Sequence, residues 1–265
     1  MSIKITTELI KELRESTGVS VMQCKNALQE ADGDMKKALA ILKKTSSDIA
    51  LKKAGRDAKD GRVLIKTEDL PTQSGKKSIL IALHCETDFV SRNEDFINLL
   101  SDLGDKALKE GIEKMKEESK DMINHVIQKT GEKIELGDIY EIKGDILGNY
   151  VHNNKTAVVV SLEGGNKELA RDIAMHITAM KPEYIFQNEI TEDIKKTINE
   201  IFQKEVANVN KPEDIKKKML EGKIATYFKE KTLLDQIFIK DPNETINELL
   251  EKNKAKIKEV KVYSI

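Results

Sequence analysis

The residues best suited to chemistry or to binding lie in one segment, residues 84–96, which reads His-Cys-Glu-Thr-Asp-Phe-Val-Ser-Arg-Asn-Glu-Asp-Phe. An apolar run, residues 79–83, precedes it, and a helical pattern follows it. Four residues occupy this strand-to-helix junction: Thr87, Asp88, Phe89 and Val90. An aromatic side chain here can either join the core or stand out as a wedge for a partner. Most Phe side chains are buried, so the local pattern alone favours the core, and the rest of the chain must decide.

Patterns typical of catalysis or of a bound cofactor are absent from the sequence. Neither G-x-x-x-x-G-K-[ST] nor G-x-G-x-x-G occurs, so no phosphate-binding loop is expected. The four histidines, at positions 84, 125, 152 and 176, are far apart and lack the spacing of metal ligands. The acidic residues form no pair with a clear general acid–base role. We therefore expect a binding protein rather than an enzyme, with no cofactor and no metal.

The charge balance bears on the kind of partner. Charged residues make up 34% of the 265 residues and aromatic residues only 4%, a composition typical of a helix-rich protein. Lysine and arginine number 45 against 46 aspartate and glutamate residues. A dedicated nucleic-acid-binding protein normally has a strong basic excess or one basic face. The first is absent, so a nucleic-acid partner is not favoured, although a basic face is not ruled out by composition.

Cysteine use and hydropathy indicate a cytoplasmic protein. Cys24 and Cys85 lie in different apolar patterns and form no C-x-x-C motif, so two buried thiols are expected rather than a disulfide. Residues 1–10 contain polar side chains and lack the apolar core of a signal peptide. No apolar run approaches the ~20 residues that a membrane span requires. No membrane association is expected.

Residues 1–55 are predicted to form a three-helix docking module. Ser20 precedes the second helix, and Gln23 three residues later predicts a capping box. Asp34 is the expected N-cap of the third helix, whose inward side chains would include Leu39. A module of about 55 residues is marginal for independent stability. The charged residues 52–61 that follow are expected to be a solvated linker.

A strand–strand–helix pattern occurs twice in the middle of the chain and predicts an α+β core of two subdomains. The first unit has strands near 62–66 and 78–85, joined by a loop that contains Pro71, and a helix that buries Phe96, Leu100, Leu103 and Ala107. The second has strands near 146–152 and 156–162 and a helix over 167–180, with Met180 on its apolar face. Similar build is expected, but a sequence duplication is not established.

Residues 190–255 are helical and strongly charged, and they predict a protruding helical hairpin or coiled-coil. Residues 257–265 alternate apolar and polar side chains, as expected for a strand that returns to the core. The expected divisions of the chain are 1–55 for the docking module, 56–143 for the first core subdomain, 144–209 with 257–265 for the second, and 210–256 for the hairpin.

Several motifs in the same order resemble the bacterial elongation factor Ts family, whose members exchange guanine nucleotide on elongation factor Tu. The motifs are Leu9-Ile10-Lys11-Glu12-Leu13-Arg14, Met22-Gln23-Cys24-Lys25, Lys52-Lys53-Ala54-Gly55-Arg56, Cys85 to Asn93, Ile173 to Ile177 with Lys181-Pro182, and Met219-Leu220-Glu221-Gly222-Lys223. Each motif alone is modest evidence, but their shared order along nearly the whole chain makes chance a poor explanation. The family's architecture of a helical module, a two-part core and a coiled-coil matches the expected elements.

The resemblance implies a function for the junction. In the family, the Thr-Asp-Phe-Val segment meets the nucleotide-binding domain of elongation factor Tu and disturbs its magnesium and phosphate site, so that GDP leaves. By resemblance these residues are Thr87, Asp88, Phe89 and Val90, with Asp88 expected to cap the turn and orient the wedge. The resemblance also implies partner contacts at Val21, Met22, Met175 and His176. The partner is elongation factor Tu, GDP-bound or nucleotide-free, and this chain needs no nucleotide site of its own.

The sequence leaves open the C-terminal contacts, the oligomeric state and an alternative function. Many members of the family continue beyond the last core strand into a further helix, whereas these residues end at Ile265, so no contact of that segment is carried over. Formation of a homodimer is also left open. The alternative function is a ribosome- or RNA-associated binding factor, supported by the lysine-bearing module and basic linker. A binding titration in salt separates the two, because an RNA complex weakens steeply as salt rises.

Overall fold

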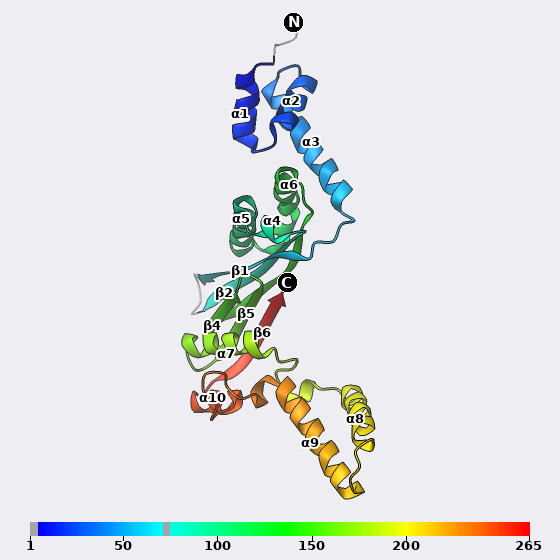
Figure 1. The fold of residues 1–265 in the computed structure, drawn as a ribbon. Coiled ribbons are helices and arrows are strands. Elements are labelled where there is room, and N and C mark those ends of the chain that lie inside the picture. The colour runs from blue at the N-terminus through cyan, green and yellow to red at the C-terminus, as the bar shows by residue number, and fades with distance from the viewer. Residues whose placement is uncertain (1–4, 71–74) are drawn as a thin grey trace.

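The computed structural model describes residues 5–70 and 75–265, so the predicted loop position Pro71 lies outside the described residues. Figure 1 shows an elongated molecule with three parts in line. A group of helices that includes the N-terminal residues lies at one end, two sheets with their covering helices lie in the middle, and a pair of helices extends at the other end. The α+β class predicted from the sequence is confirmed.

The first three helices enclose a small core of their own. They are α1 (Thr7–Thr17), α2 (Val21–Glu30) and α3 (Met35–Lys53). The Asp34 carboxylate accepts a hydrogen bond from Lys37 N at 3.1 Å, as a helix cap does. The Ser20 hydroxyl accepts one from Gln23 N, but Gln23 Oε1 has no partner, so only half of the predicted capping box forms.

Two sequence-based predictions for this region are wrong. Leu39 is exposed, because it lies about 100° around the helix from the buried Ala38. The linker is also shorter than residues 52–61, since α3 runs to Lys53 and the first strand begins at Asp60. The second half of α3 continues as a helix because Ile49 packs against the core of the next subdomain. The helical module is therefore joined to the core by packing as well as by the chain.

Two three-stranded antiparallel sheets form the centre of the molecule. The first has the order β1 (Asp60–Asp69), β2 (Lys76–Cys85) and β3 (Ile134–Gly144). The second has the order β4 (Ile146–His152), β5 (Thr156–Glu163) and β6 (Lys256–Ser264). Strand β6 is the predicted returning strand, and it pairs with β5 although nearly a hundred residues separate them. The predicted strands of both hairpins are confirmed.

The two sheets pack face to face, so their central strands are buried on both sides. In β2, Ile79, Ile81 and Leu83 face the helices, whereas Leu80 and Ala82 face the other sheet. The same alternation occurs in β5, with Val158, Val160 and Leu162 toward its helices and Ala157 and Val159 toward the first sheet. Double burial explains why both strands read as continuous apolar runs.

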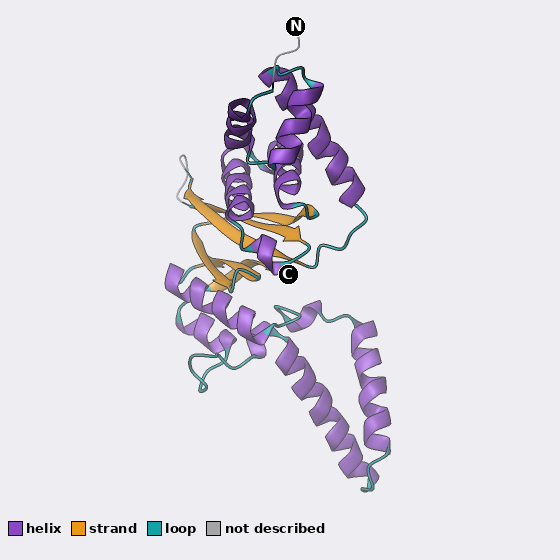
Figure 2. Cartoon of the chain, turned by 45° about the horizontal axis from the view of Figure 1, so that its top comes forward, coloured by secondary structure: helices purple, strands orange, loops and turns teal. Residues whose placement is uncertain are grey.

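Helices cover the outer face of each sheet and complete four layers (Figure 2). On the first sheet lie α5 (Glu94–Glu110) and α6 (Ile112–Thr130), and on the second lie α7 (Lys167–Met180) and α10 (Ile246–Lys252). The predicted apolar face of α5 is buried, whereas Met180 at the end of α7 is exposed. Helix α6 and strand β3 were not predicted, because charged residues crowd α6 and β3 is only partly buried.

The long helices form the protruding hairpin, but its bounds differ from the predicted 210–256. Helix α8 (Glu192–Ala207) packs against α9 (Glu213–Lys231), with the Phe202 and Tyr227 rings 5.7 Å apart and an ion pair of 2.8 Å between Lys223 and Glu205. Helix α10 instead buries Ile246 in the second core, which its apolar side chains complete. The hairpin thus spans 192–231. Independent folding of each part stays a prediction.

Helix α7 approaches the second sheet closely at Gly148 on β4. A Cβ atom at this position would lie 2.2 Å from the carbonyl carbon of Ala170 and 2.2 Å from the amide nitrogen of Arg171, both in the backbone of α7. Backbone atoms cannot move aside as the end of a flexible side chain can. Helix α7 therefore packs at its present distance only because residue 148 has no side chain.

We predict that Gly148→Ala lowers the free energy of unfolding by about 3 kcal/mol, because the added methyl group forces α7 away from β4. Urea denaturation followed by circular dichroism measures the change. Gly222→Ala is the matched control: nothing lies within 4 Å of its added Cβ on α9. It should raise helix stability by about 0.5–1 kcal/mol. Equal effects at both glycines would contradict the close packing at Gly148.

Candidate functional site

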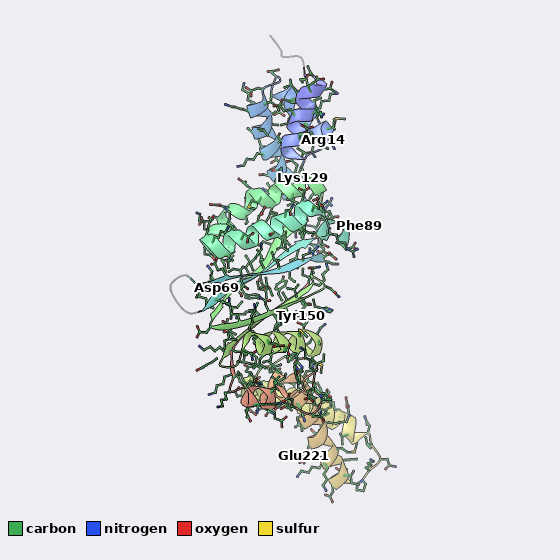
Figure 3. All side chains as sticks on the ribbon, turned by 90° about the vertical axis from the view of Figure 1, so that its left-hand side faces the viewer. Arg14, Asp69, Phe89, Lys129, Tyr150 and Glu221 are labelled. Carbon is green, nitrogen blue, oxygen red and sulfur yellow. The ribbon has the colours of Figure 1, made fainter. Side chains whose placement is uncertain are left out.

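Phe89 is the most exposed large apolar side chain among the described residues, with 83% of its surface in water. It lies on α4 (Asp88–Ser91), a one-turn helix between β2 and α5. Figure 3 shows it projecting from the side of the core, away from the body of the molecule. Of the two alternatives for this aromatic residue, the core position is therefore wrong, and the exposed position is the one that the fold adopts.

The two residues that follow Phe89 on the same turn point inward. Val90 is buried in the core of the first subdomain, and Ser91 is buried beside it. Each successive residue of a helix is rotated by about 100°, so anchoring Val90 and Ser91 in the core leaves Phe89 facing water. The Val90 side chain packs inside the protein and fixes the turn from within, so its predicted part in exchange stays a prediction.

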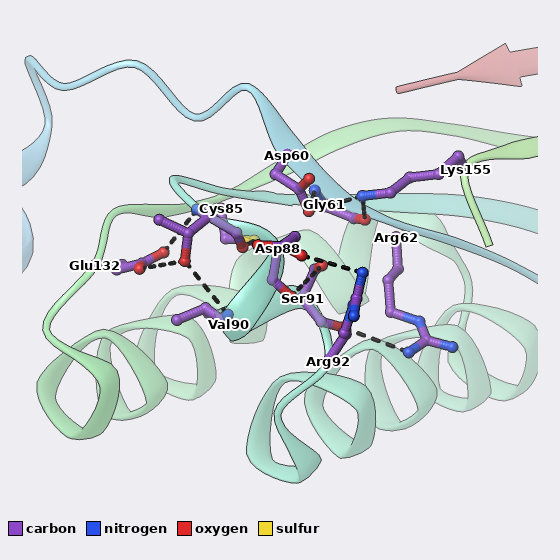
Figure 4. Close-up of polar contacts among 11 residues, drawn as sticks. Asp60, Gly61, Arg62, Cys85, Asp88, Val90, Ser91, Arg92, Glu132 and Lys155 are labelled. Atoms are coloured by element: carbon purple, nitrogen blue, oxygen red, sulfur yellow. Dashed lines mark hydrogen bonds and ion pairs between the residues drawn. The ribbon is translucent and has the colours of Figure 1, made fainter. Parts of the chain in front are cut away.

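Thr87, rather than Asp88, caps the turn. Its hydroxyl oxygen is 3.5 Å from Val90 N, a long cap interaction, and the same hydroxyl donates to Glu132 Oε1 at 2.6 Å. The Thr87 amide donates to the other carboxylate oxygen of Glu132 at 3.0 Å (Figure 4). Asp88 forms an ion pair with Arg92 at 3.0 Å on the partly exposed side of the turn. The predicted capping role of the Asp88 carboxylate is therefore wrong.

Buried polar groups beneath the turn join it to both sheets. The Cys85 thiol donates to Thr87 O at 3.1 Å, and burial, helped by the negative charges of Asp60 and Glu132, raises the pKa of this thiol to about 12. Burial also acts to raise the pKa of Asp60, but hydrogen bonds from Lys155, Ser91 and Gly61 outweigh it and hold that pKa below its usual value. A neutral thiol beside a carboxylate is no nucleophile, so this cluster is structural.

The predicted contact residues of the helical module are exposed. Val21 and Met22 begin α2 and have 52% and 63% of their surfaces in water. Two adjacent exposed apolar side chains at the start of a helix are available to a partner, and their role stays a prediction. Both cysteines are buried and free, as expected.

His176 on α7 is another predicted contact residue. It is fully buried, so its side chain cannot touch a partner in this conformation. Its Nδ1 accepts a hydrogen bond from Ile239 N at 3.2 Å, so Nε2 carries the proton and donates to Gln236 Oε1 at 2.9 Å. The neighbouring Met175 is half-buried on the same helix. Helical spacing alone did not show which side of α7 His176 occupies.

His176 instead holds a segment whose apolar side chains were missed by the sequence analysis. Ile237 and Ile239 each have 50% of their surface exposed, whereas Phe238 between them is buried. This alternation of exposed and buried apolar residues is a strand-like signal that the sequence does contain. The segment is a further exposed apolar site, on the second core subdomain.

In residues 5–70 and 75–265, no three His, Cys, Asp or Glu side chains lie close enough together to hold a metal ion. Within the same ranges, no helix is long and apolar enough to cross a membrane.

Comparison with known proteins identifies one family. The family model described as elongation factor TS matches residues 86–265. The chain is 37% identical to elongation factor Ts of Hahella chejuensis, over 96% of this chain and 89% of that protein. It is 36% identical to elongation factor Ts of Nitrosomonas eutropha, over 99% of this chain and 92% of that protein. It is 35% identical to elongation factor Ts of Alcanivorax borkumensis, over 94% of this chain and 90% of that protein.

The buried His176 should make stability depend on pH. Burial lowers the pKa of its imidazole, so the unfolded chain takes up a proton that the folded chain does not. The stabilisation is present above the unfolded pKa of about 6.5 and is lost as pH falls toward the folded value. Burial lowers the pKa of His125 as well, with the same sign. We predict that the free energy of unfolding falls between pH 7.5 and 5.5.

Urea denaturation at several pH values measures this dependence, with His176→Asn as the comparison. The variant should be less stable than the wild type at pH 7.5, because it loses hydrogen bonds in the core. It should also lose less stability between pH 7.5 and 5.5, since the contribution of His176 to that slope is removed. An unchanged slope would show that His176 is not held neutral in the folded protein.

Proposed function

This chain belongs to the elongation factor Ts family of translation elongation factors, and from that membership we propose that it promotes the release of GDP from elongation factor Tu. The observation that carries the proposal is the exposed Phe89 on an internally anchored turn. The proposal assigns the exchange role to the surface that this turn presents, which consists of Phe89 with Asp88 and Thr87 beside it.

An exposed aromatic side chain on a rigid turn is well suited to act as a wedge. Moving a Phe side chain from water into an apolar pocket is worth roughly 1.5–3 kcal/mol, and aromatic residues are frequent among those that dominate binding. Because Val90 and Thr87 fix the turn from the inside, little conformational entropy is lost when Phe89 inserts. The binding free energy is then available to displace groups in the partner rather than to order this chain.

Exchange of this kind needs no chemistry. If this chain weakens the binding of GDP to the partner, GDP weakens the binding of this chain by the same factor. The chain therefore acts by stabilising the nucleotide-free form of elongation factor Tu, and a nucleotide pocket of its own is not required. Disturbing the magnesium and phosphate site is the proposed means, since the phosphates carry most of the charge that holds the nucleotide.

Two further contacts with the partner are proposed. Val21 and Met22 on the helical module provide the first. Helix α3 of the module packs against α6, and Ile49 contacts the core of the first subdomain, so the module is not joined by a flexible tether alone. Met175 on α7 provides the second, together with Ile237 and Ile239 in the segment that is hydrogen-bonded to His176. Joining several contacts in one molecule raises affinity without any change at the wedge.

The main test is Phe89→Ala. An exposed side chain contributes little to folding, so the free energy of unfolding should stay within about 1 kcal/mol of the wild-type value. Loss of an aromatic anchor costs about 2 kcal/mol, so GDP release from elongation factor Tu should slow about 30-fold. Release of labelled GDP by stopped flow and thermal unfolding are measured on the same preparation.

Phe96→Ala serves as the control for Phe89→Ala. Phe96 is fully buried, and its loss should destabilise the chain by about 3–5 kcal/mol. A Phe89→Ala variant that releases GDP as fast as the wild type would remove the wedge from the proposal. A variant that unfolds as readily as Phe96→Ala would show that Phe89 supports the fold.

A second prediction concerns nucleotide binding by the isolated chain. If exchange works through the partner alone, calorimetry with the purified protein should detect no binding of GDP or GTP at micromolar concentrations. The same titration with elongation factor Tu is the positive control. Micromolar binding to this chain alone would favour a different function, because exchange that works by coupling through the partner requires no nucleotide site on this chain.

A further inference from the structure

The turn between α6 and β3, residues 131–133, lies directly behind the junction that carries Phe89. Its central residue, Glu132, accepts two hydrogen bonds from Thr87, one from the amide at 3.0 Å and one from the hydroxyl at 2.6 Å. Both oxygens of the carboxylate are used, and hydrogen bonds to an ionised acceptor are stronger than those between neutral groups. We call residues 87–91 the wedge turn. These two hydrogen bonds join the wedge turn to a segment that is distant in the sequence.

The same turn is itself held on two sides. On one side, Lys133 N donates to Glu86 Oε1 at 2.6 Å, and Arg56 donates to the same carboxylate at 3.2 Å. The backbone hydrogen bond from Lys133 and the nearby Arg56 lower the pKa of Glu86, so this carboxylate is charged. On the other side, the Lys53 ammonium donates to Gly131 O, and Lys133 Nζ donates to Arg56 O at 2.9 Å.

These contacts make the turn a fixed support rather than a loose loop. The end of α3 and the following segment are bonded to it, and so is the residue before Thr87. A support of this kind is needed, because Phe89 has most of its surface in water and is not held by contacts of its own. Its direction is set only from the inner side, by Val90 in the core and by Thr87 on Glu132.

We propose that Glu132 is a positioning residue for nucleotide exchange. It fixes Thr87, the first residue of the wedge turn, and thereby the direction in which Phe89 points. Glu132 does not need to contact the partner to have this effect. The proposal deepens the exchange function proposed above and rests on it. It requires that loss of Glu132 lowers the rate of exchange in the complex more than the affinity for the partner.

The first experiment separates rate from affinity. With Glu132→Ala, GDP release at saturating factor should be about tenfold slower, because a misplaced wedge inserts less often. The concentration for half-maximal effect should change less than threefold, since the other contacts remain. Glu132→Gln should recover much of the rate, because its amide can still accept one hydrogen bond and donate another to the Thr87 hydroxyl.

Two controls make this experiment specific. Glu141→Gln removes a carboxylate on β3 that pairs at 2.6 Å with Lys143 on the same strand, and it should leave GDP release unchanged. The double variant Glu132→Ala with Phe89→Ala should release GDP no more slowly than Phe89→Ala alone, because the two residues act as one unit. Additive effects of the two changes would overturn the proposal, since Glu132 would then act independently of Phe89.

The second experiment does not depend on exchange activity. The chain contains no tryptophan, so Phe89→Trp introduces a single fluorescent reporter at the wedge. Adding Glu132→Ala to this variant should lower the residual fluorescence anisotropy of the indole in the isolated protein, whereas Glu141→Gln should not. An unchanged anisotropy would overturn the positioning role. If wild-type protein failed to accelerate GDP release, the proposed function would fail, and the anisotropy would still decide whether Glu132 positions residue 89.

Discussion

The burial of strand β2 on both faces is the constraint on which the exposed site depends. Helices pack on one side of this strand and the second sheet packs on the other, so neither its position nor its register can shift. The wedge turn begins where the strand ends, and Val90 enters the same core. An aromatic side chain left in water cannot orient itself through packing, so its direction must come from the strand that precedes it and from the residues beneath it.

In this arrangement, one set of residues orders the turn and a different residue presents its apolar surface. Thr87, Val90 and Glu132 contribute order and contact the protein interior, whereas Phe89 contributes apolar surface and contacts little. A flexible aromatic side chain would lose conformational freedom on insertion, and that loss would reduce the free energy available to disturb a partner. Anchoring the turn in advance avoids most of this cost. The stability of the fold and the exposure of the wedge are thus compatible.

Much of the fold could be predicted from local patterns, because strands buried on both faces and residues such as Asp34 at helix starts have clear local signals. Helix α6 could not, since charged residues obscure its apolar face. The helical hairpin could be predicted, but its bounds are 192–231 and not 210–256. At the site, the location of the junction was predictable from the local pattern, whereas the exposed position of Phe89 was implied only by the family resemblance. It depends on which of two adjacent residues faces the core, a difference of about 100° that only tertiary packing decides.

The exposed isoleucines of the second subdomain give the rigid core a further consequence. Ile237 and Ile239 lie on the second subdomain, whereas Phe89 lies on the first. The two sheets are joined by an ion pair of 2.7 Å between Lys155 and Asp60, in addition to their shared apolar layer. The distance between the two sites is therefore set by the fold. A partner that binds at both sites must therefore match that distance, because the packed sheets leave this chain little freedom to change it.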